Sequence, residues 1–107
     1  VRRAISQELN EALDVVDGLI GPTTPTTAFR FGQHTTPLSM YLTDLFTIPA
    51  CLAELPAISV PCGVVDGLPV GFQIMARRFD EAMCFRVAGA VERLMTPLSF
   101  PFLAVEA

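Results

Sequence analysis

The sequence predicts an α/β fold: a mixed sheet that contains an antiparallel strand pair and is covered by helices. Two apolar stretches, about residues 57–62 and 70–76, are joined through Asp66-Gly67, a dipeptide that favours the positive φ angles of a tight hairpin turn. Near each end of the chain, apolar residues recur at steps of three and four, as they do on amphipathic helices. These observations predict two core strands, with one helix before them and one after them in the sequence, both packed on the sheet.

The composition is more apolar than that of a typical small domain. Of the 107 residues, 51% are hydrophobic and 17% are charged, against about 25% charged residues in an average globular domain. A small domain has proportionally more surface to cover with polar groups, so this balance favours an interior piece of a larger fold. We therefore expect a single unit that packs against further elements.

Charge and hydropathy argue against two classes of partner. The net charge is -4, and the seven basic residues are all arginines scattered along the chain. They form no basic field for phosphates, so we expect no direct nucleic-acid contact by this segment. Apolar runs are broken by Pro and Gly well short of the roughly 18 residues that a membrane span needs, and no signal peptide opens the chain. We expect no membrane contact, and the start at Val1 suggests a fragment.

Three cysteines stand in apolar surroundings, at Cys51, Cys62 and Cys84. Their odd number and the absence of a Cys-x-x-Cys pair argue against a disulfide framework. We expect buried, reduced thiols in a compartment of the cytosolic type.

The first part of the chain predicts a helix and a short strand. Residues 2–16 carry one apolar stripe, and Asp17-Gly18 is expected to end the helix because Gly accepts the left-handed backbone of many helix exits. Residues 19–21 then read as a short buried strand, and residues 22–27 as an irregular polar loop.

The middle of the chain predicts broken helix followed by strand. Residues 38–55 are helical in their first half, through Leu45 and Phe46, and Pro49 is expected to break the run before a second short helix at about 50–54. Residues 57–62 are almost wholly apolar, as in a strand buried on both faces, and Leu68 and Pro69 are expected to lengthen the hairpin turn.

The last part predicts a capped helix and an apolar tail. Asp80 is a candidate N-cap, Arg93 suits the last turn, and Pro97 is expected to end the helix. Residues 98–107 read as an apolar tail. The predicted core stripe of this helix consists of Met83, Val87, Val91, Leu94 and Met95.

The side chains that could carry chemistry do not form a recognisable triad. No Gly-x-Ser-x-Gly elbow surrounds any serine. Ser59 is expected inside a buried strand with its hydroxyl bonded to backbone, and His34, the single histidine, in a solvated loop without a metal. Asp44 differs, because a carboxylate within an apolar run must reach solvent, cap a helix or meet a positive group.

Three phrases of the sequence resemble a known family. They are Phe-Thr-Ile-Pro-Ala at 46–50, Leu-Pro-Ala-Ile-Ser-Val-Pro-Cys-Gly at 55–63 and Asp-Gly-Leu-Pro-Val-Gly-Phe-Gln-Ile at 66–74. They resemble the C-terminal part of the amidase signature family. Gly-Pro-Thr-Thr-Pro at 21–25 and Val-Pro-Cys-Gly at 60–63 favour, within it, the A subunits of the amidotransferases that act on glutamyl-tRNA(Gln) or aspartyl-tRNA(Asn). The resemblance implies that residues 1–107 are the C-terminal part of an amidase signature domain.

The resemblance implies a substrate-binding role for Asp44. In those subunits an aspartate just before the Phe-Thr-Ile-Pro-like segment binds the α-amino group of glutamine. An ionised carboxylate in a partly dry pocket makes a charge-assisted hydrogen bond to an ammonium, which selects an amino acid over a plain amide. Two positions depart from the family pattern, which usually has Asn at Cys51 and Gly at Glu54. Loss of that amide removes hydrogen-bonding groups that would tie the helix to neighbouring backbone.

The resemblance places the catalytic residues outside this sequence. The family uses a Ser nucleophile, a second Ser with a cis peptide bond, and a Lys, whereas this chain has no lysine and no Gly/Ser-rich stretch. Those residues would precede Val1. In the implied reaction the serine attacks the side-chain amide of glutamine, backbone amides hold the oxyanion, ammonia leaves, and water clears the acyl-enzyme. This segment would form one wall of the glutamine pocket.

The implied partners are the missing N-terminal part of the chain and the B and C subunits of the amidotransferase. ATP and Mg are implied for the whole complex, in which glutamyl-tRNA is amidated on the B subunit, and none is expected in this segment. The implied location is the cytoplasm or an organellar matrix. The isolated piece is expected to lack glutaminase activity and to aggregate, because it would expose apolar faces.

Two alternatives stay open at this stage. The chain could be a fragment of a stand-alone amidase that acts on another amide, or it could be a non-catalytic packing module. The packing module predicts that replacing Asp44 leaves the affinity for glutamine unchanged.

Overall fold

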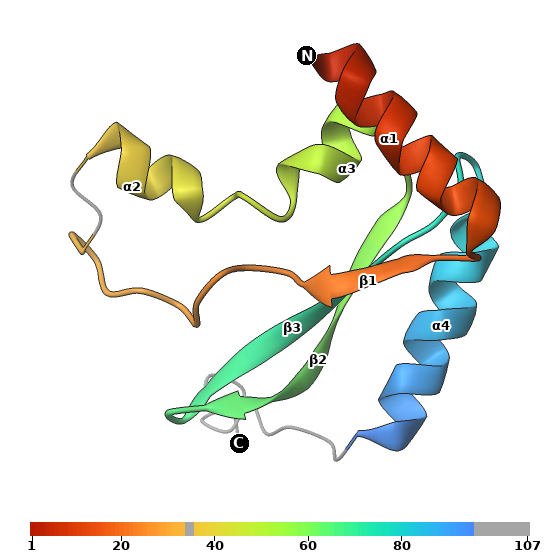
Figure 1. Cartoon of the computed structure of the whole chain (residues 1–107). Coiled ribbons are helices and arrows are strands. Elements are labelled where there is room, and N and C mark those ends of the chain that lie inside the picture. The colour runs from red at the N-terminus through yellow and green to blue at the C-terminus, as the bar shows by residue number, and fades with distance from the viewer. Residues whose placement is uncertain (34–35, 96–107) are drawn as a thin grey trace.

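The computed structural model describes residues 1–33 and 36–95 (Figure 1). The α/β class predicted from the sequence is confirmed. The predictions for His34, Pro97 and the tail at 98–107 lie outside the described residues. In chain order the elements are α1 (Arg2–Val15), β1 (Leu19–Pro22), α2 (Pro37–Leu42), α3 (Ile48–Ala53), β2 (Ala57–Val65), β3 (Leu68–Met75) and α4 (Glu81–Leu94).

The three described strands form a sheet of order β1-β3-β2, and both pairings are antiparallel. The predicted strand pair is confirmed, with Ser59 of β2 opposite Gln73 of β3. On the other edge of β3, Ile20 of β1 lies opposite Ile74. The central strand β3 therefore joins the N-terminal segment to the hairpin.

The hairpin turn consists of Asp66 and Gly67, as predicted, with φ angles of 51° and 79°. Such left-handed pairs match the twist of the flanking strands. The expectation that Leu68 and Pro69 lengthen the turn is wrong, because Leu68 already pairs with Val65 and Pro69 pairs within the ladder. The turn geometry closes the hairpin without extra residues.

Helices cover the two sides of the sheet unequally. Helix α4 packs on one face, where Val60, Ile74 and Ala88 form a buried cluster. On the other side α1 packs against α3, around a second buried cluster (Figure 1). The residues of that second cluster are Leu13, Ala53 and Leu55.

The prediction that β2 is buried on both faces is wrong for the described chain. Val60 is buried, whereas Ala57, Ser59 and Pro61 on the opposite face are exposed. Strand β1 is also less covered than predicted, since Ile20 is 64% exposed. The apolar sequence of these strands exceeds what the described helices cover.

Helix α1 ends within a residue of its predicted end, but the reason differs from the prediction. Val16 is extended and closes the helix, and Gly18 does not adopt a positive φ. A Cβ atom at Gly18 would lie 3.3 Å from the carbonyl oxygen of Met75. The glycine therefore allows a close approach to β3 and does not provide a left-handed helix exit.

The predicted helical run at 38–55 is two short helices with a turn between them. Thr36 caps α2 by accepting a hydrogen bond from the backbone N–H of Ser39 at 3.1 Å. Leu45 and Phe46, expected in helix, lie in the turn. Pro49 does not break a helix but lies in the first turn of α3, where its missing N–H has no helical partner to lose.

Helix α4 begins as predicted. The carboxylate of Asp80 accepts a hydrogen bond from the N–H of Met83 at 3.2 Å, and Arg93 lies in the last turn. The buried residues are Cys84 and Ala88. The predicted stripe is confirmed at Val87 and Val91, which pack against the buried cluster on the sheet, and is wrong at Leu94 and Met95, which are exposed.

Glu54 ends α3 in a conformation that favours glycine. Its φ and ψ angles are 58° and 41°, which is left-handed. Arg2 contacts the Glu54 carboxylate at 3.0 Å and donates to the carbonyl oxygen of Leu52 at 3.0 Å. Arg78 donates to the carbonyl oxygen of Ala53 at 3.1 Å. Two arginines thus bind the C-terminal carbonyls of α3, which suits the negative end of a helix dipole.

Replacing Glu54 with Gly is expected to raise the midpoint of thermal unfolding. A left-handed non-glycine residue costs about 1–2 kcal/mol, whereas exposed ion pairs contribute about 0–1 kcal/mol. The matched control is Glu54→Ala, which loses the ion pairs and keeps the strain, and which should lower the midpoint. If both variants shift the midpoint equally, backbone strain at this position is not the cause.

Candidate functional site

Asp44 lies in the turn that connects α2 to α3. Its carbonyl oxygen accepts hydrogen bonds from the N–H groups of Thr47 and Ile48, both at 3.1 Å. The residue is exposed, and its carboxylate makes no hydrogen bond or ion pair with any residue in the described ranges. The backbone of the turn is therefore fixed while the carboxylate is available to an incoming cation.

A cavity of about 340 Å³ lies between this turn, α3 and the uncovered face of the sheet. Its hydroxyl and amide side chains come from the loop after β1 (Thr23), the turn (Thr47), β2 (Ser59) and β3 (Gln73). The full lining is Thr23, Thr47, Ala50, Cys51, Leu55, Ala57, Ile58, Ser59 and Gln73. The cavity therefore brings together four of the phrases that carry the family resemblance, at 21–25, 46–50, 55–63 and 66–74.

The expectations for Ser59 are wrong. It is exposed on the open face of β2, and its hydroxyl lies 2.6 Å from that of Thr23 instead of bonding backbone. No hydrogen bond joins Ser59 to Asp44 within the described part of the chain. The hydroxyl of Ser59 has a structural partner and no adjacent base, so its contacts do not support a nucleophilic role.

Gln73 is a residue that the sequence reasoning missed. It is 5% exposed and is the only buried polar side chain within residues 1–33 and 36–95. Its Nε2 donates to the carbonyl oxygen of Phe46 at 2.8 Å, across 27 positions of sequence. A lone amide within the apolar stretch 68–76 was the available signal, because buried polar groups require a partner.

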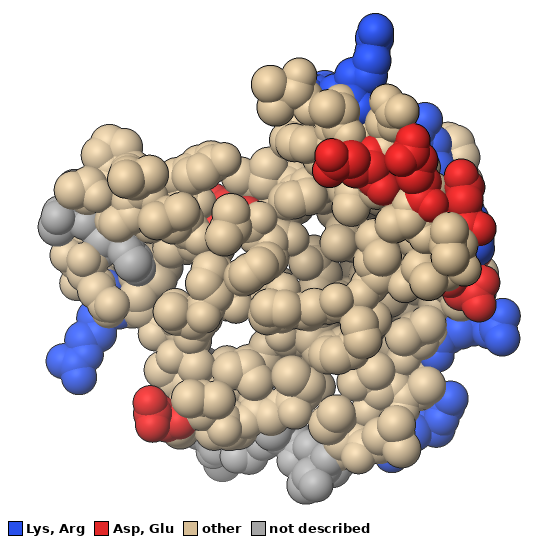
Figure 2. Space-filling view, viewed as in Figure 1, with Lys and Arg blue, Asp and Glu red and all other residues tan. Residues whose placement is uncertain are grey.

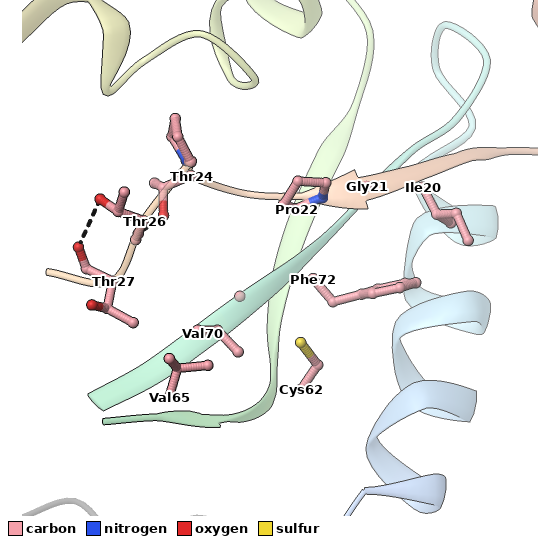
Figure 3. Close-up of a pocket in the computed structure, with 12 residues that line it drawn as sticks. Ile20, Gly21, Pro22, Thr24, Thr26, Thr27, Cys62, Val65, Val70 and Phe72 are labelled. Carbon is pink, nitrogen blue, oxygen red and sulfur yellow. Dashed lines mark hydrogen bonds between the residues drawn. The ribbon is translucent and has the colours of Figure 1, made fainter. Parts of the chain in front are cut away.

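The largest of the described cavities lies elsewhere. A groove of about 600 Å³ opens on the α4 side of the sheet, beside the hairpin and the loop at 23–27. Figure 3 shows Phe72, Cys62, Val65 and Val70 along the hairpin side of this groove. Cys62 is the extra residue of a bulge in β2, since its two neighbours both pair with β3.

The groove offers little chemistry. Thr24 and Thr26 donate their hydroxyls to backbone carbonyls of the same loop, at 2.7 and 3.0 Å. Its lining residues include no carboxylate and no cationic group. We assign no substrate to it and retain the turn at Asp44 as the candidate site.

The cysteines are free, as predicted, but only one of them is buried. Cys51 is exposed, Cys62 is half-buried and Cys84 is buried. Burial raises the pKa of the Cys84 thiol above its ordinary value, and the nearby carboxylates of Asp80 and Glu81 act in the same direction. The prediction of three buried thiols is therefore wrong for Cys62 and for Cys51, and Cys51 lines the cavity beside the turn.

The charged side chains do not form a single cluster on the face drawn in Figure 2. Figure 2 shows acidic side chains gathered over α1, with basic side chains dispersed at the periphery of the same face. Within the described ranges, no three or more His, Cys, Asp or Glu side chains are grouped so that they could hold a metal ion. None of the helices in residues 1–33 and 36–95 is both long and apolar enough to cross a bilayer.

Comparison with known proteins places the chain in a defined class. The sequence matches the Amidase family over residues 1–85, which is most of the chain. The chain therefore belongs to the Amidase family, and the resemblance found in the sequence is confirmed.

Within this class the chain is similar to one particular protein. The A subunit of the glutamyl-tRNA(Gln) amidotransferase of Thermotoga maritima is 55% identical over 93 residues, which cover 87% of this chain and 20% of that protein. Its crystal structure superposes with a TM-score of 0.90 at 50% identity, over 99% of this chain and 24% of the other. The same subunit of Anaeromyxobacter sp. (strain K) is 50% identical over 104 residues, or 94% of this chain and 21% of that protein.

More distant members share the fold. The crystal structure of an amidase superposes with a TM-score of 0.80 at 25% identity, over 89% of this chain and 23% of the other. The chain spans about a fifth of the length of the curated relatives that it matches. The described elements therefore match a segment of the amidase fold.

Proposed function

We propose that the complete protein containing this chain is the A subunit of a glutamine-hydrolysing amidotransferase. It would release ammonia for the conversion of glutamyl-tRNA(Gln) to glutaminyl-tRNA(Gln). The observation that carries the proposal is the 55% identity to the Thermotoga maritima subunit together with the TM-score of 0.90. Residues 1–107 would be the C-terminal part of its amidase signature domain.

In this proposal the segment binds substrate and performs no covalent step. Asp44 would accept the α-ammonium of glutamine, since its carboxylate is exposed and has no partner among the described residues. The Ser nucleophile, the second Ser and the Lys would come from the preceding part of the protein. We therefore expect the isolated 107-residue chain to release no ammonia from glutamine.

The remaining partners would act on the product of this reaction. The B and C subunits would receive the ammonia and the tRNA, and ATP with Mg would serve the amidation there. We assign no ATP- or Mg-dependent step to this segment, because the amidation that uses them would take place on the B subunit.

The proposal is tested by comparing two amides. The complete protein, assembled with its partner subunits, is supplied with glutamine or with glutaramate, which lacks only the α-amino group, and released ammonia is measured. A hydrogen bond to a charged group contributes about 1.5–3 kcal/mol, so kcat/KM should favour glutamine by about 10- to 100-fold. Equal values for the two amides would contradict the proposal and favour a stand-alone amidase with a different substrate.

A further inference from the structure

The turn that carries Asp44 has few contacts with the rest of the fold. Helix α2, which precedes it, packs extensively against no other described helix or strand. Figure 1 shows α2 standing apart from the sheet, with the turn leading back to α3. Among the described elements, α3 and the sheet are therefore the ones that can hold the Asp44 backbone in place.

Gln73 of β3 attaches the turn to the sheet. Its Nε2 donates to the carbonyl oxygen of Phe46 at 2.8 Å. In the described ranges, this is the only hydrogen bond that joins residues 36–47 to the sheet. Gln73 itself lies on the central strand, between Ile74, which is completely buried, and Phe72, which packs against the same buried cluster. The backbone of Gln73 is therefore held by the well-packed central strand.

The chain from Gln73 to the candidate site is short and continuous. Phe46 is two residues after Asp44, and the Asp44 carbonyl oxygen is itself held by the N–H groups of Thr47 and Ile48 at 3.1 Å. Gln73 and Thr47 also line the same cavity. A movement of the Phe46 carbonyl would consequently move the Asp44 carboxylate relative to the sheet.

We propose that Gln73 is a positioning residue for substrate binding: through the Phe46 carbonyl, it holds the Asp44 carboxylate where the α-ammonium of the substrate arrives. The inference rests on the proposed function. Gln73 lines the cavity, but its Nε2 is already bound to the Phe46 carbonyl oxygen, so it would act through Asp44 and not by donating to the substrate. A purely structural buried amide would instead affect the folded protein as a whole, without selectivity for one substrate group.

The test uses the complete protein with its partner subunits and the near-isosteric variant Gln73→Met. A neutral hydrogen bond contributes about 0.5–1.5 kcal/mol net, so its loss should raise KM for glutamine about 3- to 10-fold with kcat nearly unchanged. For glutaramate, measured as a substrate or as a competitive inhibitor, the KM or inhibition constant should not change. Gln73→Glu, which removes the donor and places a carboxylate against the Phe46 carbonyl, should act in the same direction.

Two comparisons separate positioning from loss of stability. Ile74→Val removes a methylene from the opposite face of the same strand, and it should lower the melting midpoint without raising KM for glutamine. In the background of Asp44→Asn, Gln73→Met should add less than a twofold change in KM. Non-additivity of this kind is expected when two residues act through one interaction.

The outcomes are distinct. If Asp44→Asn raises KM for glutamine while Gln73→Met does not, the positioning role is overturned and the proposed function stands. The positioning role is also overturned if Gln73→Met raises the KM for glutamine and for glutaramate equally. The same holds if the effects of Gln73→Met and Asp44→Asn on KM for glutamine are fully additive. If Asp44→Asn leaves KM for glutamine unchanged, the substrate-binding role of Asp44 and the positioning role of Gln73 both fail, whereas the comparison of glutamine with glutaramate still decides the proposed function.

Discussion

Replacing Asp44 with Asn in the complete protein is expected to raise KM for glutamine about 10- to 100-fold, the loss that follows from removing a charged hydrogen-bond partner. Asparagine keeps the size and one acceptor of the side chain but removes the charge that would attract the α-ammonium. The exposed position of Asp44 makes the variant unlike a core substitution. The measurement is ammonia release from glutamine under steady-state conditions.

Selectivity is the decisive part of this expectation. Asp44→Asn should leave the kinetics of glutaramate unchanged, because that amide has no α-ammonium. The matched control is Asp14→Asn, which removes an exposed carboxylate from α1. This variant should leave KM unchanged for both amides. An equal loss for both amides in Asp44→Asn would mean that the residue supports the pocket as a whole, and the assignment of the ammonium to it would be wrong.

Local signals in the sequence predicted the parts of the fold that local physics determines. Asp66-Gly67 predicted the hairpin because both turn positions need positive φ, and the structure has both. Asp80 predicted the start of α4 because a carboxylate can accept the free N–H groups of a first turn. In each case the residues that cause the structure are neighbours in sequence.

Burial could not be predicted in the same way. The apolar sequence of β2 is suited to two covered faces, but the described helices cover one, so Ser59 is exposed and bonds Thr23. Sequence pattern reports how apolar a strand is and does not report which other elements are present to cover it.

The candidate site was predicted in part. Asp44 was selected from the family resemblance, and its role remains a prediction. Gln73 was missed because its function depends on Phe46, which is 27 residues away in sequence and adjacent only after folding. Glu54 stands where the family usually has Gly, and its left-handed backbone shows why glycine suits that position. Cys51 stands where the family usually has Asn, and it places an exposed thiol beside the cavity.

Replacing Gly71 with Ala is expected to destabilise the fold by about 1–3 kcal/mol, the usual cost of forcing extra atoms into a packed site. A Cβ atom there would lie 2.6 Å from Oγ of Ser59 and 2.7 Å from Oγ1 of Thr23, which are themselves hydrogen-bonded. The carbonyl oxygen of Gly71 also accepts the N–H of Thr23 at 3.2 Å. The added methyl would therefore push apart the contacts that hold the end of β1 to the hairpin, and the midpoint of thermal unfolding of the complete protein should fall.

Gly21 provides the matched control, because it lies in the neighbouring strand β1 and a Cβ atom there would meet nothing within 4 Å. Gly21→Ala should therefore be neutral or slightly stabilising, since alanine restricts the unfolded chain. In the background of Ser59→Ala, the loss caused by Gly71→Ala should shrink, because one of the two close contacts is gone. Equal effects of the two glycine substitutions would show that strand propensity, and not the contact with Thr23 and Ser59, determines the requirement for glycine at this position.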